Sequence, residues 1–247
     1  MSIYPSITCV HQPPFLPWLG IVESMFVCET FIVYDDVQFE DGGYQNRNRI
    51  KTSSGAEWIT VPVRKRFGQL ISEVEIADTY SPAKIRRSLE LNYSRAPYYR
   101  DLSSEIGDVL VPNGRKLVDL NMQLLNYVKD KLQAGCEFRR SSEITISYTD
   151  RAERLLNLCR AVDAAWLYSG SGTRAYADEA NYERNGVRII WHDYQDRHMN
   201  YPQLYPRLGF IPCLSFVDPL FNIGPLELSS VLKQSGLETV NAQMTHA

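Results

Sequence analysis

Side chains that could do chemistry first occur where a short apolar run near the start of the chain ends. The run Ile7–Val10 is followed by His11 and Gln12 and then by two prolines, which end a strand. An imidazole can donate to a phosphate or act as an acid or base near neutral pH. We expect His11 to be catalytic and Gln12 to bind substrate. The alternative is a histidine that only ties the loop to backbone carbonyls.

A second apolar run ends in two carboxylates. Phe31–Tyr34 precedes Asp35 and Asp36, and Gln38 follows two residues later. Adjacent side chains of an extended chain point to opposite faces, so we expect at most one of the aspartates to face a site. That carboxylate would act as a base or bind a sugar hydroxyl or an ammonium group, with Gln38 beside it; the alternative is a turn at the strand end. No further oxygen ligands are spaced to suggest a metal site.

A cluster of basic residues follows in a chain whose net charge is −3. In an extended segment, alternation would place Arg47, Arg49 and Lys51 on one face, interleaved with Asn46 and Asn48. Guanidinium groups bind phosphate or carboxylate through paired hydrogen bonds, and a lysine adds a mobile charge. We therefore expect a phosphate-bearing substrate here. The alternative is an edge strand that its charges protect from pairing.

Further substrate-binding candidates lie in the first loop and in the second half of the chain. Ser169 and Gly170 begin a Ser-Gly-Ser-Gly-Thr turn, where backbone amides can approach an anion. This turn matches neither the P-loop nor the GxGxxG motif. Loop shaping by Trp18 and a helix cap at Asp218 are the alternatives for two of the remaining candidates. Those candidates are Trp18, Tyr201, Gln203 and Asp218.

The composition is that of a soluble globular protein. Hydrophobic residues make up 44% and charged residues 22% of the 247 residues. The weakly negative net charge predicts no binding to nucleic acid, and no apolar run approaches the ~18 residues of a membrane span. The five cysteines are scattered and no secretory signal is visible, so we expect reduced thiols in a cytoplasmic protein. We expect no membrane partner, no metal and no other cofactor.

Apolar periodicity predicts the elements that must position these side chains. Helical spacing from Trp18 to Cys28 lies between the first two apolar runs, and such strand–helix–strand units pair their strands in parallel. Asn48–Thr52 and Glu57–Val63 flank a turn and predict a β-hairpin. Further strands are expected at Gln69–Ile76, Glu143–Ser147, Trp166–Tyr168 and Val187–Trp191.

The middle of the chain is predicted to be helical. Helices are expected after Ser81, near Pro97, and from Leu117 to Leu132 with Gly135 as the stop. The final helix is expected at Ser229–Gln234, with a loose tail after Gly236. We thus predict a single α/β domain over residues 1–247: a mostly parallel sheet with flanking helices, a β-hairpin insertion after the second strand and a central helical insertion at about 80–135.

A series of sequence blocks resembles the WbqC-like family. The blocks are VHQPPFLPWLG, FIVYDDVQF, GGYQNRNRIK followed by WITVPV, RAPYY, YSGSG, YPQ and LSFVDPLFN, and they cover nearly the whole chain. Bacterial members are often encoded among surface-polysaccharide or secondary-metabolite genes, so the resemblance implies a cytoplasmic role in modifying sugars or similar amines. The matching positions are His11, Gln12, Trp18, Asp35, Asp36, Gln38, Asn46, Arg47, Asn48, Lys51, Ser169, Gly170, Tyr201, Gln203 and Asp218.

The leading hypothesis is a transferase that joins an acyl or aminoacyl group to an amine, such as that of an amino sugar or nucleotide-activated sugar. The basic cluster would hold the phosphate of the substrate or of an acyl carrier protein's pantetheine. His11 or one aspartate would take the amine's proton, and amides near Gly170 could stabilise an oxyanion. The alternatives are a nucleotidyltransferase acting on a sugar phosphate or small acid, and a non-catalytic sugar-phosphate binding protein. The start is loosely similar to HxGH nucleotidyltransferases but lacks the second histidine.

Overall fold

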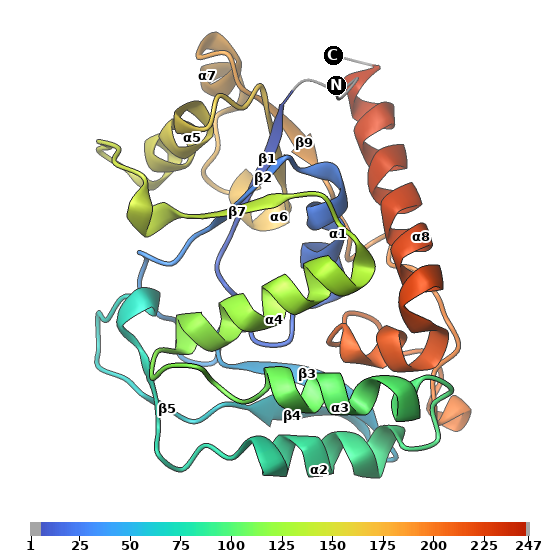
Figure 1. Cartoon of the computed structure of the whole chain (residues 1–247). Helices are drawn as coiled ribbons and strands as arrows, with labels where there is room; N and C mark the ends of the chain where they lie inside the picture. Colours follow the sequence, from blue (N-terminus) through green and yellow to red (C-terminus); the bar gives the residue numbers. More distant parts are fainter. Residues whose placement is uncertain (1–5, 246–247) are drawn as a thin grey trace.

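A computed structural model of the chain, which describes residues 6–245, contains a five-stranded parallel sheet between two layers of helices (Figure 1). The strands lie in the order β7-β2-β1-β8-β9. The chain therefore builds outward from β1 in one direction and later returns to extend the sheet on the other side. The strands are β1 (Ile7–His11), β2 (Thr30–Val33), β7 (Glu137–Arg140), β8 (Trp166–Ser169) and β9 (Arg188–Trp191). The predicted α/β class is confirmed.

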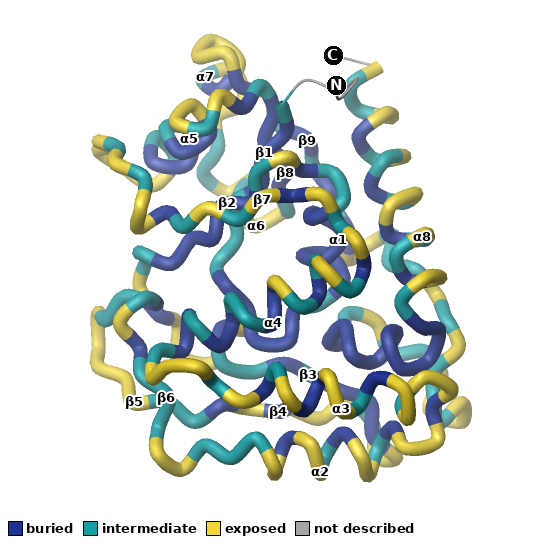
Figure 2. Tube along the Cα trace, viewed as in Figure 1, coloured by how far each residue is buried: buried dark blue, intermediate teal, exposed yellow. Residues whose placement is uncertain are grey.

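Alternating side chains of the central strands enter two separate cores, as the pleat of a strand requires. Cys9, Phe31 and Tyr168 belong to the larger core, together with α1 (Leu19–Val27), α4 (Leu117–Leu132) and α8 (Val217–Met244). Leu167 packs on the opposite face against α5 (Arg151–Ala161) and α7 (Glu179–Arg184). Figure 2 shows that the central strands are buried along most of their length.

The predicted hairpin and helical insertion lie between β2 and β7, and both predictions are confirmed. The hairpin pairs β3 (Arg47–Thr52) with β4 (Gly55–Thr60) around a two-residue turn. It lies beside α2 (Pro82–Tyr93) and α3 (Tyr99–Val109), while α4 runs between this region and the sheet (Figure 1). The expected strand at Gln69–Ile76 is mostly wrong. It contains a short 3₁₀ turn, Ile71–Glu73, and only β6 (Glu75–Ile76), which pairs with β5 (Val63–Arg64).

The strand predicted at Glu143–Ser147 is wrong, because the sheet is extended by β7 at Glu137–Arg140 instead. As an edge strand, β7 carries charged residues that hide its pattern. Only Phe138 packs inward, edge-on against Phe31 with ring centroids 5.2 Å apart. α4 ends at Leu132, as predicted. The residue that stops it is Gln133, in the left-handed region at φ 55°, rather than the predicted Gly135.

The last helix is much longer than the six residues expected. The predicted loose tail is wrong for residues 237–244, which are helical, while residues 246 and 247 lie outside the described residues. α8 runs from Val217 to Met244, with a bend at Gly224, whose φ is 80°. Its second part follows α1 along the side of the molecule (Figure 1). Gly236, where we expected the helix to have ended, is buried at this contact: a Cβ there would lie 2.6 Å from Cγ1 of Val27. The glycine permits the close approach of the two helices.

The lengths of the helices and the state of the cysteines complete the description of the fold. Within residues 6–245, no helix combines the length and apolar character needed to cross a membrane. All five cysteines are free thiols, and all but Cys213 are buried.

The contact at Gly236 gives a test of the fold. Gly236→Val should lower the free energy of unfolding by about 1–3 kcal/mol, because the added side chain overlaps Val27 in a closely packed interface. Gly135→Val is the matched control, since a Cβ at position 135 meets nothing within 4 Å. Urea denaturation measures both. Equal stability of the two variants would contradict the packing of α8 on α1.

Candidate active site

A cleft lies at the carboxyl ends of β1 and β8, where the chain connections diverge to opposite sides of the sheet. Open α/β sheets bind their ligands at this point, because the diverging connections leave a crevice there. Two adjoining hollows form the cleft. The β2-side lobe has a volume of about 300 Å³ and the β9-side lobe one of about 260 Å³. Both are lined by Val10, His11, Trp18, Ile21, Gly172 and Thr173.

The β2-side lobe is lined by amide, phenol and charged groups. Gln45 donates a hydrogen bond to Oε1 of Gln12, and its own Oε1 is buried without a partner among the described residues. The Arg151 guanidinium lies 4.4 Å from the centroid of the Tyr176 ring. This lobe therefore offers a cation and a free acceptor to a polar ligand. Its remaining polar lining residues include Tyr34, Glu40 and Tyr44.

The loop that follows β1 is held in place by side-chain amides from other elements. Nδ2 of Asn121, in α4, donates to Pro13 O at 2.9 Å and to Gln45 O at 2.7 Å. Nδ2 of Asn48 donates to Leu16 O at 2.6 Å. Asn48 is fully buried, so it supports the cleft from behind rather than lining it. Asn48, which we expected to bind substrate, therefore holds the loop after β1 in place.

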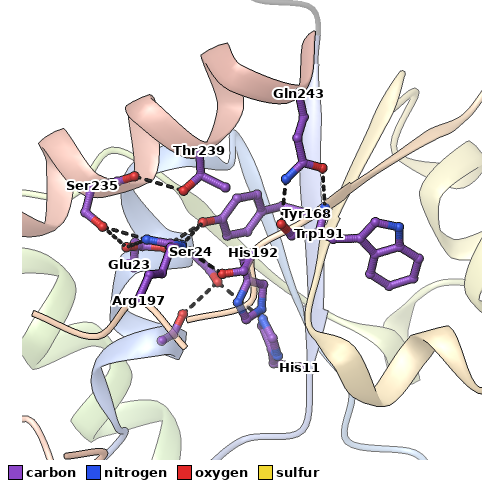
Figure 3. Close-up of polar contacts among 11 residues, drawn as sticks. His11, Glu23, Ser24, Tyr168, Trp191, His192, Arg197, Ser235, Thr239 and Gln243 are labelled. Atoms are coloured by element: carbon purple, nitrogen blue, oxygen red, sulfur yellow. Dashed lines mark hydrogen bonds and ion pairs between the residues drawn. The ribbon is translucent and has the colours of Figure 1, made fainter. Parts of the chain in front are cut away.

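His11 forms the floor shared by the two lobes, and its tautomer follows from its neighbour (Figure 3). Nε2 lies 3.3 Å from Oγ of Ser24. The single hydroxyl proton of Ser24 goes to Gly20 O at 3.1 Å, so Oγ accepts a hydrogen bond from Nε2 of His11. Nδ1 then carries a lone pair. It has no hydrogen-bond partner among the described residues and is free to meet a ligand.

A second imidazole, His192, lies beside the first. The two ring centroids are 6.1 Å apart, and the His192 ring stacks on Tyr168 at 5.0 Å. Burial lowers the pKa of His11 to about 3, with a further contribution from His192, and lowers that of His192 to about 4. Both rings are therefore neutral at physiological pH.

A buried polar network holds the segment after β9 that carries His192 (Figure 3). Glu23, in α1, is fully buried; it pairs with Arg197, Nη1 to Oε2 at 3.0 Å, and accepts from Tyr168 Oη at 2.6 Å. Oγ of Ser235, in α8, donates to the same carboxylate at 2.7 Å. Arg197 Nε donates to the backbone oxygen of His192 at 3.0 Å. The ion pair between Glu23 and Arg197 thus connects α1, β8 and α8 to the backbone of His192.

The two aspartates are held outside the cleft. Asp35 is fully buried and accepts from Nε of Arg140 at 2.6 Å and from the backbone N of Ser142 at 3.1 Å. Asp36 pairs with Nη2 of Arg154 at 2.5 Å. Neither carboxylate lines either lobe. Their contacts tie the end of β2 to the end of β7 and to α5.

The basic cluster divides into a partly buried pair and a buried lysine. The guanidinium of Arg47 lies 4.1 Å from the Trp58 ring centroid, and that of Arg49 lies 5.9 Å from it. The Trp58 ring lies 5.6 Å from that of Tyr44, which lines the β2-side lobe, but neither arginine lines either lobe. Lys51 is fully buried, and its Nζ donates to Gln203 Oε1 at 3.0 Å and to Gly209 O at 2.6 Å.

Lys51 belongs to a second polar cluster, separate from the cleft. Oη of Tyr93 donates to Asp218 at 2.6 Å, and Gln203 Nε2 donates to Tyr201 Oη at 3.1 Å. Burial lowers the pKa of Lys51 and raises that of Asp218. None of these residues lines either lobe. The cluster joins the hairpin to α2, to the loop after β9 and to α8.

The structure therefore brings together only part of the predicted site. Five predicted residues line the cleft: His11, Gln12, Trp18, Ser169 and Gly170. Gln38 is exposed and lines a different hollow, and Nδ2 of Asn46 donates to Val61 O at 2.9 Å within the hairpin region. The imidazole of His11 thus lines the cleft, whereas the carboxylates of Asp35 and Asp36 and the guanidinium groups of Arg47 and Arg49 do not.

Sequence reasoning missed several residues of the cleft. His192 follows directly after β9, as His11 ends β1, so the rule that polar residues at strand ends form sites would have found it. Tyr34 ends the second apolar run and could have been found in the same way. Arg151 begins α5 and Tyr176 lies in the turn before α7, and neither has a comparable signal. Among residues 6–245, no group of three or more His, Cys, Asp or Glu side chains is placed to hold a metal ion.

Comparison with known proteins identifies relatives but not a reaction. A family model described as the WbqC-like protein family matches residues 12–230. The chain is similar to the uncharacterised protein Rv1507c of Mycobacterium tuberculosis, with 36% identity over 218 residues, which is 87% of this chain and 93% of that protein. No solved structure matches the chain.

The two neutral imidazoles predict a pH dependence of stability. Their folded pKa values lie below the unfolded value of about 6.5, so the unfolded chain binds more protons and stability falls as the pH drops from about 7 towards 4. Each ring should remove about 1–2 kcal/mol of the free energy of unfolding between pH 7 and 5. Urea denaturation of the wild type, His11→Asn and His192→Asn at both values measures this loss, which each substitution should reduce. An unchanged loss in both variants would contradict the burial of neutral rings.

Proposed function

We propose that this protein, which belongs to the WbqC-like protein family, is an enzyme that transfers an acyl or aminoacyl group to an amine held in the cleft. The observation that carries the proposal is the position of His11, which lines both lobes. A transfer reaction must bring two substrates to one proton-accepting group, and a base at the junction of two lobes meets that requirement.

The chemistry assigned to His11 uses its free nitrogen. Nδ1 accepts a hydrogen bond from the incoming amine, which selects the neutral, nucleophilic form. The amine nitrogen attacks the acyl carbon, the C–N bond forms, and the bond from that carbon to the leaving group breaks. The proton passes from nitrogen through Nδ1 to the leaving group in one concerted step, because the low pKa of His11 disfavours a lasting imidazolium. The hydrogen bond between Nε2 and Ser24 keeps the required tautomer throughout.

The proton is assigned to His11 rather than to an aspartate on geometric grounds. Asp35 and Asp36 are engaged by Arg140 and Arg154, and neither lines the cleft. We propose that both carboxylates hold the ends of β2 and β7, which fixes the wall of the β2-side lobe. Folded Asp36→Asn protein should then keep its turnover.

The donor is proposed to enter through the β2-side lobe. Arg151 lines that lobe, and Arg47 lies over Trp58, whose ring contacts Tyr44 of the same lobe. Guanidinium groups suit a phosphate, so a donor such as an acyl group on coenzyme A or on an acyl carrier protein fits this side. Lys51 is not proposed to bind the donor, because its buried ammonium group already donates hydrogen bonds to two protein oxygens.

The setting proposed for the reaction is the bacterial cytoplasm, in surface-polysaccharide or secondary-metabolite biosynthesis. The free thiols are compatible with a reducing compartment. The resemblance to this family, whose bacterial members are often encoded among such genes, is the ground on which the setting is proposed.

Nucleotidyl transfer is a second candidate, favoured by one observation. With its strands numbered by their sequence order within this sheet, the order is 3-2-1-4-5, and doubly wound sheets of this order bind nucleotides where the order reverses. That reversal is the position of the cleft. This candidate predicts magnesium-dependent release of pyrophosphate from a nucleoside triphosphate, which acyl transfer does not.

His11→Asn should lower kcat/KM for amide formation by roughly 10²–10⁴, because it removes the proton acceptor but keeps a polar side chain of similar reach. Acyl and aminoacyl thioesters of coenzyme A and of acyl carrier proteins are incubated with amino sugars and their nucleotide-activated forms. Mass spectrometry measures the amide.

The matched control is His198→Asn, which removes an imidazole that stacks on Phe210 and lines neither lobe. It should keep wild-type turnover. Full amide formation by folded His11→Asn would overturn the role given to His11. Pyrophosphate release without amide formation would favour the second candidate.

A further inference from the structure

His192 is a buried polar side chain with no partner, at the edge of an open lobe. The residue is only 4% exposed, and neither Nδ1 nor Nε2 has a hydrogen-bond partner among the described residues. A neutral imidazole carries one N–H donor and one lone pair, and leaving both unpaired in a dry site costs free energy. The ring lines the β9-side lobe next to His11. A ligand that both donates and accepts would satisfy it.

The turn after β8 lies close against this ring. A Cβ at Gly170 would lie 3.0 Å from Nε2 of His192 and 3.1 Å from its Cε1. Any other residue at this position would therefore press on this buried nitrogen, which has no partner among the described residues. Gly172, two residues later in the same turn, has nothing within 4 Å of its Cβ position. The absence of a side chain thus matters for His192 at position 170 but not at 172.

The charges of the β9-side lobe differ from those of its neighbour. Among the residues that line it, none is a lysine or arginine, whereas Asp193 and Asp196 are carboxylates. Asp193 pairs with Arg174 at 2.7 Å, while Asp196 is exposed at the rim. Two hydroxyl groups also line it: Oγ of Ser169 and Oγ1 of Thr173 are hydrogen-bonded to each other at 2.7 Å. The lobe is suited to a cationic, hydroxylated group and unsuited to a phosphate.

We propose that the β9-side lobe is the acceptor subsite of the cleft, and that it binds a primary amine with neighbouring hydroxyl groups through His192. The imidazole orients the ligand by donating one hydrogen bond to the ligand's hydroxyl groups and accepting one from them. The amine then lies between the rim carboxylates and His11, within reach of Nδ1. The assignment of this lobe as the acceptor subsite rests on the proposed transfer reaction. The binding of an amino polyol in the lobe does not depend on that reaction.

The test uses glucosamine as the probe, with glucose as its uncharged counterpart and inorganic phosphate as the anionic one. Ring ¹⁵N–¹H NMR signals of His192 are followed in the full-length protein at pH 7, and binding constants are taken from the shifts. Glucosamine should move these signals and bind more tightly than glucose, and phosphate should leave them unchanged. Gly170→Ala should weaken glucosamine binding by about tenfold, because it covers Nε2 without removing the ring. Gly135→Ala, at an exposed position outside both lobes where a Cβ meets nothing within 4 Å, should bind as the wild type does.

The outcomes separate this inference from the proposed function. The inference is overturned if glucosamine leaves the His192 signals unchanged, if phosphate moves them instead, or if Gly170→Ala binds glucosamine as well as Gly135→Ala does. Its binding claim stands, and the transferase proposal fails, if glucosamine binds as expected while no donor yields an amide. Amide formation with no loss in Gly170→Ala would leave the transferase proposal standing and remove His192 from acceptor binding.

Discussion

The divergence of the chain on the two sides of β1 is the constraint on which the site depends. Because β2 and β7 extend the sheet in one direction and β8 and β9 in the other, no connection covers the carboxyl ends of β1 and β8. The end of β1 therefore delivers His11 to the floor of an open cleft. Asn121 and Asn48 fix the following loop by bonding its backbone oxygens, so the cleft keeps its shape without a ligand.

Most of the charged residues near the cleft hold elements together instead of facing it. Glu23 with Arg197, Asp35 with Arg140, and Asp36 with Arg154 join segments that are far apart in sequence. A carboxylate taken out of water must be paired, and an unpaired one would be strongly destabilising. These pairs surround the site and fix its walls, which leaves its floor to neutral groups. The result is a cleft whose central groups are uncharged and whose charges stand at the rim.

The sequence predicted the parallel α/β fold, the hairpin and the helical insertion, because apolar runs and helical spacing report burial directly. It failed at β7, where charged residues of an edge strand hide the alternation, and at α8, where Gly236 marks a close contact rather than a helix end. For the site, the types of residue that follow the predicted strands identified His11 and Gly170. They could not distinguish a carboxylate in the cleft from one paired behind it, as with Asp35, because pairing partners such as Arg140 are distant in sequence.

The account depends most directly on the state of His11: a neutral ring, protonated on Nε2, with Nδ1 open to the cleft. Long-range ¹H–¹⁵N NMR of the histidine rings at pH 7 reports this state, with the signals assigned through His11→Asn and His192→Asn. The account predicts a protonated Nε2 and an unprotonated Nδ1 for His11. A doubly protonated ring, or a proton on Nδ1, would contradict it.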